Sequence, residues 1–221
     1  MELRPVVVIA PHPDDESLGC GGTVKHLTLS GIPVDVIYMT SGELGCDMPE
    51  TATIETKRAL AAVRVEEARG ACDVLGVRRV VFLGDTDGAL GRQQDLVKSL
   101  RKTLRREPYQ RVFCPWPEEA HPDHRAAFLW TRDALIEHPT RPDLWLYEVW
   151  TPMRANTFVP IDTTVRFKQA AIERHRSQLQ VLDYRAAFLG LAAYRALFCA
   201  GSRYAEAFLV GAAASSSSRR E

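Results

Sequence analysis

The stretch VVVIAPHPDDE at residues 6–16 joins an apolar run directly to a histidine and three carboxylates. The run Val6–Ala10 is short and rich in β-branched residues, which is typical of a buried strand. In an open parallel sheet, ligands bind in the crevice at the carboxyl ends of the strands. The stretch therefore predicts a buried strand that ends in a loop with binding or catalytic side chains.

Further elements follow the same pattern along the chain. Short apolar runs recur at residues 34–39, 80–83, 112–114 and 144–149, and helical patterns cover about 17–29, 54–75, 95–106, 123–137 and 163–182. In the clearest helix, over 54–75, Gly76 supplies the stop signal. This alternation predicts βαβ units, and hence a single-domain, Rossmann-like three-layer α/β fold with a mostly parallel sheet over residues 1–211. Residues 212–221 include four consecutive serines and are expected to form a disordered tail.

The composition excludes several classes of partner. The chain has 221 residues, and its 28 lysines and arginines balance 28 acidic residues, so no net charge attracts nucleic acid or an anionic membrane. The five cysteines form an odd set without a CxxC pair, which favours a reducing compartment. Neither a signal peptide nor an apolar run of ~18 residues is found, so we expect a cytoplasmic protein without integral membrane association. The sequence leaves homo-oligomer formation open.

A second histidine motif, His121-Pro122-Asp123-His124, follows the apolar run at 112–114 and precedes a predicted helix. Its loop and the loop at residues 11–16 can face one crevice, because both follow the carboxyl end of a strand. A divalent ion bound by His12, Asp15 and His124 would have two imidazoles and one carboxylate, with positions left for water. That ligand count is typical of a catalytic zinc site, although it also suits Fe(II).

The remaining acids and histidine of the two motifs are candidates for proton transfer. Neighbouring side chains in a turn that enters a helix point in different directions, so Asp14 can face the substrate while Asp15 binds metal. Asp14 can then take a proton from an activated water, and His121 is the second proton carrier. We expect the Asp123 carboxylate to hydrogen-bond His121, fix its tautomer and favour its charged form.

Simpler interpretations were weighed for each feature. A single HxxD is also typical of a capped helix start, but two histidine motifs at equivalent places favour a metal site. We expect the other histidines to be structural or solvated, the glycines to permit close helix packing, and the aromatic residues to lie in the core or an interface rather than on a ligand. These residues are His26, His138 and His175; Gly19, Gly21 and Gly22; and Trp130, Trp145, Tyr147 and Trp150.

Taken together, the motifs resemble those of the PIG-L or LmbE-like superfamily of zinc-dependent N-acetylglucosaminyl deacetylases. The resemblance covers about residues 5 to 210. It is carried by 11–16, Arg64 with Glu67, Leu75-Gly76, Leu83-Gly84, Asp87-Gly88, 121–124, Lys168, His175, Ser177, Gln178 and 206–208.

This resemblance implies one zinc ion per chain on His12, Asp15 and His124. It further implies that Asp14 is the general base, and that His121 stabilises the oxyanion and is oriented by Asp123. The substrate-binding residues implied are Arg64 and Asp87, although Arg64 could equally form a salt bridge.

The expected activity is that of a hydrolase that removes an N-acetyl or related N-acyl group from a small-molecule amino-sugar conjugate. Two rival interpretations stay open. One is a metal-dependent phosphoesterase, which would need a second ion. The other is a non-catalytic, metal-stabilised binding module, although structure alone would require neither Asp14 nor His121.

Overall fold

The strands form a mixed, mostly parallel sheet in the computed structural model, which describes residues 3–45, 48–49, 51–93, 95–136 and 138–211. Within these residues, seven strands pair in the order β3-β2-β1-β4-β5-β7-β6. Strands β1 to β5 are parallel, and β7 is antiparallel to both β5 and β6. The bounds are β1 Val6–Ala10, β2 Val34–Thr40, β3 Arg79–Asp85, β4 Arg111–Pro115, β5 Asp143–Tyr147, β6 Thr157–Pro160 and β7 Ala205–Val210. The predicted α/β fold class is confirmed.

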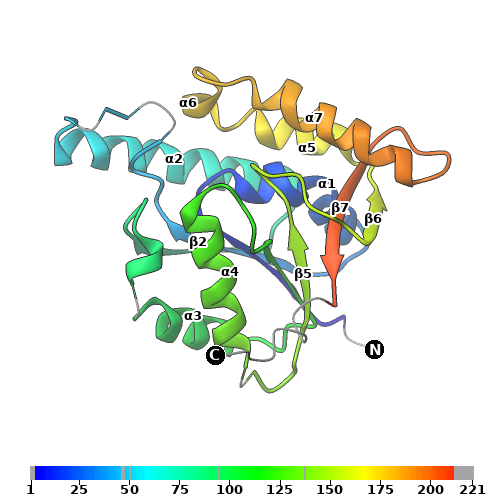
Figure 1. The fold of residues 1–221 in the computed structure, drawn as a ribbon, viewed down its shortest axis with the longest axis horizontal. Helices are drawn as coiled ribbons and strands as arrows, with labels where there is room; N and C mark the ends of the chain where they lie inside the picture. The colour runs from blue at the N-terminus through cyan, green and yellow to red at the C-terminus, as the bar shows by residue number, and fades with distance from the viewer. Residues whose placement is uncertain (1–2, 46–47, 50, 94, 137, 212–221) are drawn as a thin grey trace, which may run out of the picture.

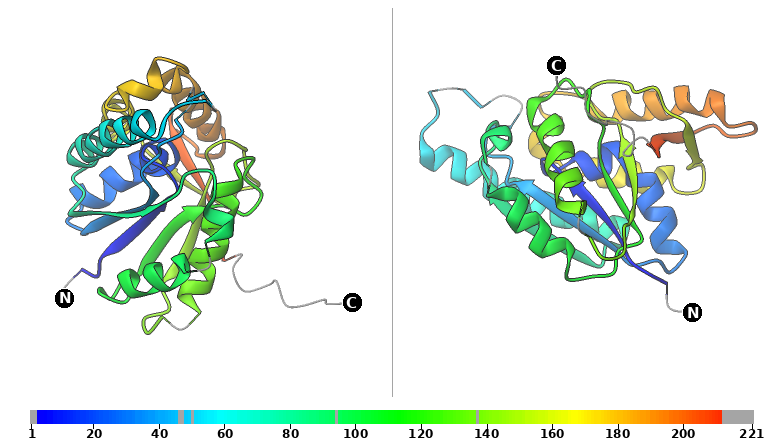
Figure 2. Two further views of the ribbon diagram at one scale, coloured as in Figure 1. Left: turned by 90° about the vertical axis from the view of Figure 1, so that its left-hand side faces the viewer. Right: turned by 60° about the horizontal axis from the view of Figure 1, so that its bottom comes forward.

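Helices cover both faces of the sheet (Figures 1 and 2). One face carries α1 Asp15–Leu29, α2 Ile54–Leu75, α5 Val165–Ile172, α6 Arg176–Leu179 and α7 Tyr184–Arg195. The other face carries α3 Leu96–Leu104 and α4 Pro122–Leu135, with the short 3₁₀ helix Leu90–Arg92 beside α4. Alternate side chains of β1 enter the two cores, Val6 and Val8 on one side and Val7 and Ile9 on the other. A strand buried on both faces reads as a continuous apolar run, which is why β1 was recognisable.

The glycines of α1 allow close packing, as expected. A Cβ on Gly19 would collide with the ring of Tyr147, and one on Gly22 would lie 2.8 Å from the side chain of Ile161. The helix also bends at Cys20, whose φ of −144° is not helical. Close approach to the sheet therefore explains Gly19 and Gly22, as the sequence indicated.

A buried carboxylate holds the bend in α1. Glu206 of β7 accepts hydrogen bonds from the backbone N–H groups of Gly22 and Thr23, at 2.9 and 2.7 Å. Lys168 of α5 donates to the same carboxylate and to the Leu18 carbonyl, both at 2.6 Å. The second half of α1 thus has an acidic N-cap supplied by a distant strand.

The predicted helix over 163–182 was wrong in one respect, because the structure divides it. Helix α5 ends at Ile172 and α6 begins at Arg176. The break lets Ser177 donate its backbone N–H and its hydroxyl to the Glu67 carboxylate, at 2.8 and 2.7 Å. It also places His175 in the core with Nε2 3.5 Å from Glu16, so His175 is structural, with an acidic partner from a distant part of the sequence.

The strand expected at 144–149 ends earlier, at Tyr147. Beyond it, the Glu119 carboxylate accepts the backbone N–H groups of Val149 and Trp150, at 2.6 and 3.0 Å, which turns the chain out of the sheet. Strands β6 and β7 and helix α7 were not predicted. No helix among the described residues is both long and apolar enough to cross a membrane, and the tail expected at 212–221 lies outside the described residues.

Candidate metal and catalytic site

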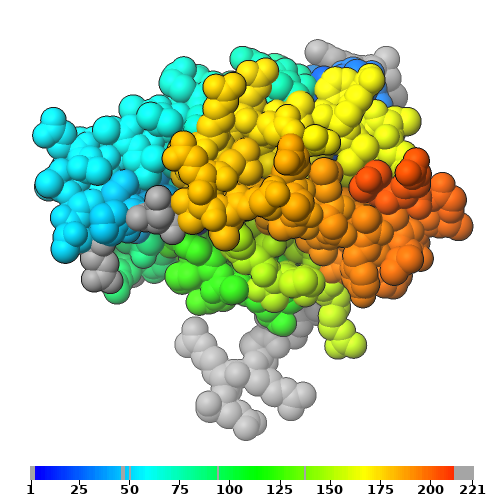
Figure 3. All heavy atoms as spheres, turned by 90° about the horizontal axis from the view of Figure 1, so that it is seen from above, coloured from blue at the N-terminus to red at the C-terminus, as the bar shows by residue number. Residues whose placement is uncertain are grey.

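Two histidine loops meet at the carboxyl edge of the sheet because β1 and β4 are adjacent and parallel. A cavity of about 180 Å³ opens beside them. It is lined by His12, Asp14, Asp15, Gly45, Arg64, Asp87, His121, Trp150, Gln178 and Tyr184. Helices α5 to α7 lie over this side of the molecule next to α2 (Figure 3). The crevice predicted at the strand ends is thus present and contains most of the candidate site residues.

The three predicted metal ligands converge on one carboxylate oxygen. Oδ2 of Asp15 lies 3.4 Å from Nδ1 of His12 and 3.3 Å from Nε2 of His124. In a tetrahedral site with bonds of about 2.0–2.1 Å, neighbouring donor atoms lie about 3.3–3.4 Å apart. Both imidazole nitrogens therefore lie at ligand spacing from the Asp15 oxygen.

The surroundings of His124 also fit a bound cation. The residue is completely buried, and neither ring nitrogen has a hydrogen-bond partner among the described residues. A buried polar group without a partner is costly unless something else satisfies it. Burial acts to raise the pKa of Asp15, but the charges of His124 and His12 hold that pKa far below its usual range. An ionised carboxylate beside an imidazole without a partner is a donor set suited to a divalent ion.

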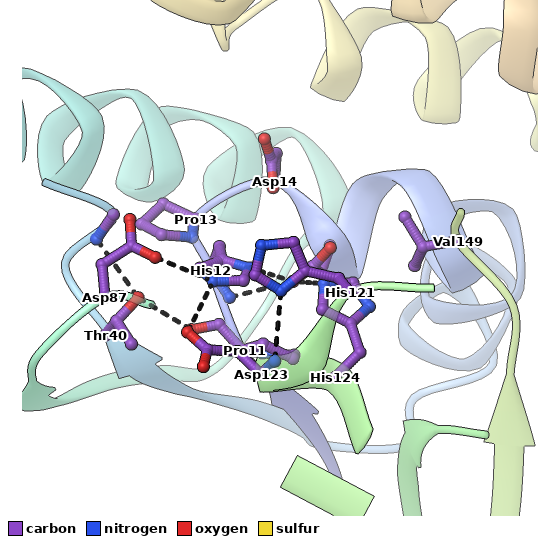
Figure 4. Close-up of polar contacts among 12 residues, drawn as sticks. Pro11, His12, Pro13, Asp14, Thr40, Asp87, His121, Asp123, His124 and Val149 are labelled. Carbon is purple, nitrogen blue, oxygen red and sulfur yellow. Dashed lines mark hydrogen bonds and ion pairs between the residues drawn. The ribbon is translucent and has the colours of Figure 1, made fainter. Parts of the chain in front are cut away.

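Two further carboxylates orient His12. Its Nε2 lies 3.1 Å from Oδ1 of Asp87 and 3.3 Å from Oδ2 of Asp123, as the dashed lines in Figure 4 show. Burial lowers the pKa of His12, but the hydrogen bonds to Asp123, Asp15 and Asp87 outweigh it and raise the pKa well above 6.5. Without a metal ion these carboxylates favour the charged ring. In the neutral ring that binds a metal ion, an N–H on Nε2 directed at Asp87 and Asp123 would leave the Nδ1 lone pair for the ion, which is the usual arrangement of a metal-binding histidine.

Two groups of ligand atoms lie within 4.8 Å of one another: those of His12, His121 and His124, and those of His12, Asp87 and Asp123. The first group adds His121 to the two predicted histidine ligands, and the second would be a separate ion site. Asp123 already accepts the N–H groups of Gly88 and Leu90, at 2.7 and 3.1 Å. Asp87 accepts that of Leu44 at 3.0 Å, and the hydrogen bonds with His12 help to lower its pKa to about 2 although burial opposes the shift. These contacts indicate that Asp87 and Asp123 hold the His12 ring in place rather than bind an ion of their own.

Asp14 points away from this cluster, as Figure 4 shows, and toward α2. Its φ of 142° is unfavourable for a residue with a side chain, so the surrounding structure must hold this backbone conformation. Arg64 of α2 holds the loop by donating to the Pro13 carbonyl at 2.8 Å, the Gly42 carbonyl at 2.9 Å and Asp14 Oδ2 at 3.1 Å. Of the two roles considered for Arg64, the structure shows the salt bridge.

Burial raises the pKa of Asp14 to about 6, against the opposing charge of Arg64. A carboxylate whose pKa lies near neutrality is suited to general-base catalysis. Asp14 and Asp15 therefore have different surroundings although they are adjacent in the sequence.

The expected contact between the Asp123 carboxylate and the His121 ring is not formed. The Asp123 carboxylate faces His12 and two backbone N–H groups instead, and Nδ1 of His121 accepts the backbone N–H of Asp123 at 3.2 Å. Burial, together with the charges of His12 and His124, lowers the pKa of His121 to about 4. The predicted imidazolium is thus corrected to a neutral ring with its proton on Nε2.

Four cavity residues were not identified as functional from the sequence: Gly45, Trp150, Gln178 and Tyr184. Trp150 had been assigned to the core or an interface, yet it is 39% exposed at the cavity. Gln178 formed part of the family resemblance but had no assigned role. The signal available in the sequence was its place in the run His175-Arg176-Ser177-Gln178, which is part of the resemblance.

Comparison with known proteins agrees with the motifs. The sequence pattern of the PIG-L family, described as GlcNAc-PI de-N-acetylase, matches residues 7–135. Diacetylchitobiose deacetylase of Thermococcus kodakarensis is 32% identical over 193 residues, which are 80% of this chain and 71% of the relative. A probable N-acetyl-alpha-D-glucosaminyl L-malate deacetylase 2 of Bacillus cereus is 32% identical over 126 residues, 56% of this chain and 57% of the relative.

A solved structure shows the same fold over nearly the whole chain. It is the N,N'-diacetylchitobiose deacetylase from Pyrococcus horikoshii in complex with its inhibitor, with a TM-score of 0.81 and 27% identity. The match covers 95% of this chain and 84% of that structure. Since the family pattern matches more than half of its length, the chain belongs to the PIG-L family of GlcNAc-PI de-N-acetylases.

Proposed function

We propose that the protein is a metal-dependent N-deacetylase that releases acetate from an N-acetylated amino-sugar conjugate. The convergence of His12, His124 and Asp15, with a separately held Asp14 on the same cavity wall, is the observation that carries the proposal. The deacetylase relatives support the reaction class. Zinc is the ion we propose, because two imidazoles and one carboxylate form a common catalytic zinc set.

His12, Asp15 and His124 would hold the ion. When bound, the ion would act as a Lewis acid, which lowers the pKa of a nearby water molecule and polarises the acetyl carbonyl group of the substrate. The Asp14 carboxylate accepts a proton from the attacking water, whose oxygen bonds to the acetyl carbon. Arg64 fixes that carboxylate toward the cavity, so no reorientation is needed during the reaction.

His121 stabilises the developing negative charge as a neutral donor. Its Nδ1 accepts the Asp123 N–H, so the proton on Nε2 is available to the acetyl oxygen. When the carbon–nitrogen bond breaks, the proton held by Asp14 passes to the departing amine. The second proton of the water stays on the new carboxyl group and is lost to solvent as acetic acid ionises, so the products are acetate and a free amino sugar.

Acetate release tests this proposal against its two rivals. The purified protein, loaded with zinc, is incubated separately with N,N'-diacetylchitobiose and with p-nitrophenyl phosphate. We expect acetate release that a chelator stops, and no phosphate release. Phosphate release without acetate would support the phosphoesterase, and metal binding without either product would support the binding module.

A further inference from the structure

The group attached to the reacting sugar is not defined by the catalytic residues, and the following inference about it rests on the proposed function. The residues at the rim of the cavity indicate which kind of group is attached to the sugar. Among the ten described residues that line the cavity, Trp150 is the one with an exposed side chain, at 39%. The acids and Arg64 are all buried, and His121 and Gly45 are half-buried. Trp150 is therefore the lining residue at the solvent-facing rim of the cavity.

The indole is held in place by the protein before any ligand arrives. Its ring packs edge-to-face with the rings of Tyr184 and Phe188 of α7, with centroids 5.7 and 6.3 Å away and planes inclined at 66° and 74°. Its backbone N–H donates to Glu119 at 3.0 Å. An aromatic side chain that is anchored yet exposed can bind an apolar surface without losing much conformational entropy.

The size of the cavity brings part of the substrate to this ring. At about 180 Å³ it is smaller than the sites of drug-sized ligands, which measure about 300–1,000 Å³. The acetamide must reach His12 and Asp15 at the base, so one sugar unit fills the cavity. Whatever that sugar carries must pass the rim and meet Trp150.

Charge restricts what that group can be. Besides the metal ligands, the two carboxylates of Asp14 and Asp87, His121 and Arg64, the lining contains four uncharged residues: Gly45, Trp150, Gln178 and Tyr184. Arg64 is the only lysine or arginine among the described lining residues, and its guanidinium is engaged by Asp14 and two backbone carbonyls. A carboxylate or phosphate on the attached group would find no cation free to pair with it among the described residues that line the cavity, and would lose hydration.

We infer that Trp150 determines substrate specificity by stacking on a neutral sugar attached to the reacting N-acetylglucosamine. The C–H groups on one face of a pyranose are apolar and slightly positive, and the face of an indole ring is negative. This contact selects a neutral saccharide conjugate over a conjugate with an anionic aglycone.

The test compares kcat/KM for three substrates: N-acetylglucosamine, N,N'-diacetylchitobiose and an N-acetylglucosaminide of malate. Trp150→Ala should lower kcat/KM for the disaccharide about tenfold, while Trp150→Phe retains most of it. The loss for the monosaccharide should be several-fold smaller than the loss for the disaccharide. Tyr194→Ala removes an aromatic ring that is 54% exposed but does not line the cavity, and it should change none of these values.

Two outcomes would overturn the inference. One is an equal loss for monosaccharide and disaccharide in Trp150→Ala, which would assign the residue to packing against Tyr184 and Phe188. The other is a higher wild-type kcat/KM for the malate conjugate than for the disaccharide.

A binding measurement separates failure of this inference from failure of the proposed function. If wild type releases acetate from no substrate, the proposed deacetylase activity fails. Calorimetric titration of the Asp14→Asn protein with N,N'-diacetylchitobiose then decides the role of Trp150. A Kd about tenfold weaker after Trp150→Ala supports the stacking contact, and an unchanged Kd overturns it.

Discussion

The backbone at Asp14 separates the roles of two adjacent carboxylates. With φ at 142°, the Asp14 side chain faces Arg64, while Asp15 turns toward His12 and His124. Both residues could be selected from the sequence, because their motif is dense in acids and follows a buried strand. The direction of Asp123 could not, because its partners are backbone N–H groups of Gly88 and Leu90, more than thirty residues earlier.

We expect Asp14→Asn to retain the metal ion yet lose most of its hydrolytic activity. The amide cannot accept a proton from water, and removal of a positioned base typically lowers the rate by ~10²- to 10⁴-fold. The measurements are kcat for acetate release and the metal content of the same preparation. Near-normal turnover with metal bound would show that another group takes the proton.

At the scale of single elements, strong local sequence patterns were sufficient to predict a helix or strand. The elements that were predicted wrongly or missed depend on tertiary contacts. Helix α2 runs over Ile54–Leu75, as predicted, with Thr53 accepting the Thr56 N–H and Gly76 in a left-handed conformation. The division between α5 and α6 depends instead on the Glu67 carboxylate of α2, which no local pattern reveals. Strand β7 is defined largely by its antiparallel partners β5 and β6.

The pair formed by Glu206 and Lys168 should stabilise the bend in α1. Glu206→Gln leaves the buried Lys168 ammonium without its counter-charge, and removing one partner of a buried pair costs about 3–5 kcal/mol. The double variant Glu206→Gln/Lys168→Met removes both charges and should recover part of that loss. Urea unfolding gives the free energies, and a loss below about 0.5 kcal/mol in the single variant would contradict a stabilising role.

At the start of β2, Asp35 should make folding stability depend on pH. Burial opposes its ionisation, but hydrogen bonds from Arg78, Tyr109 and Arg79 prevail and lower its pKa. Because the folded-state pKa lies below the unfolded value of about 3.9, the contribution of Asp35 is complete above that value. It is lost as the pH falls through the folded-state pKa.

The stability deficit of Asp35→Asn, measured by urea unfolding, should therefore be largest near pH 7 and shrink below about pH 4. Asp95→Asn is the matched control, since Asp95 pairs with Lys98 on the exposed surface and surface pairs contribute little. A deficit in Asp35→Asn that stays constant from pH 7 to pH 3 would rule out this linkage.

At the scale of the whole molecule, two hydrophobic cores on opposite faces of the sheet stabilise the fold. The predicted metal ligands lie at the carboxyl edge of the sheet. Apolar runs and helical periodicity were enough to predict this three-layer arrangement. They were not enough to predict the cavity, whose wall includes Trp150 from the segment after β5 and Gln178 from α6. Such residues follow no period, and their place depends on how Glu119 and Glu67 turn the chain.

The position of the site outside both cores predicts that the fold survives loss of the metal ion. A chain of this length can bury roughly 70% of its unfolded surface without a metal ion, and the two cores are built from apolar side chains on opposite faces of the sheet. Treatment with a chelator should therefore abolish acetate release and leave the far-ultraviolet circular dichroism unchanged. Added zinc should restore the activity.

His124→Ala should likewise lose metal and activity while it remains folded, although its Tm can fall because a bound ligand stabilises the native state. Metal analysis, circular dichroism and activity on the same samples provide the test. Global unfolding on chelation would assign the ion a structural role instead.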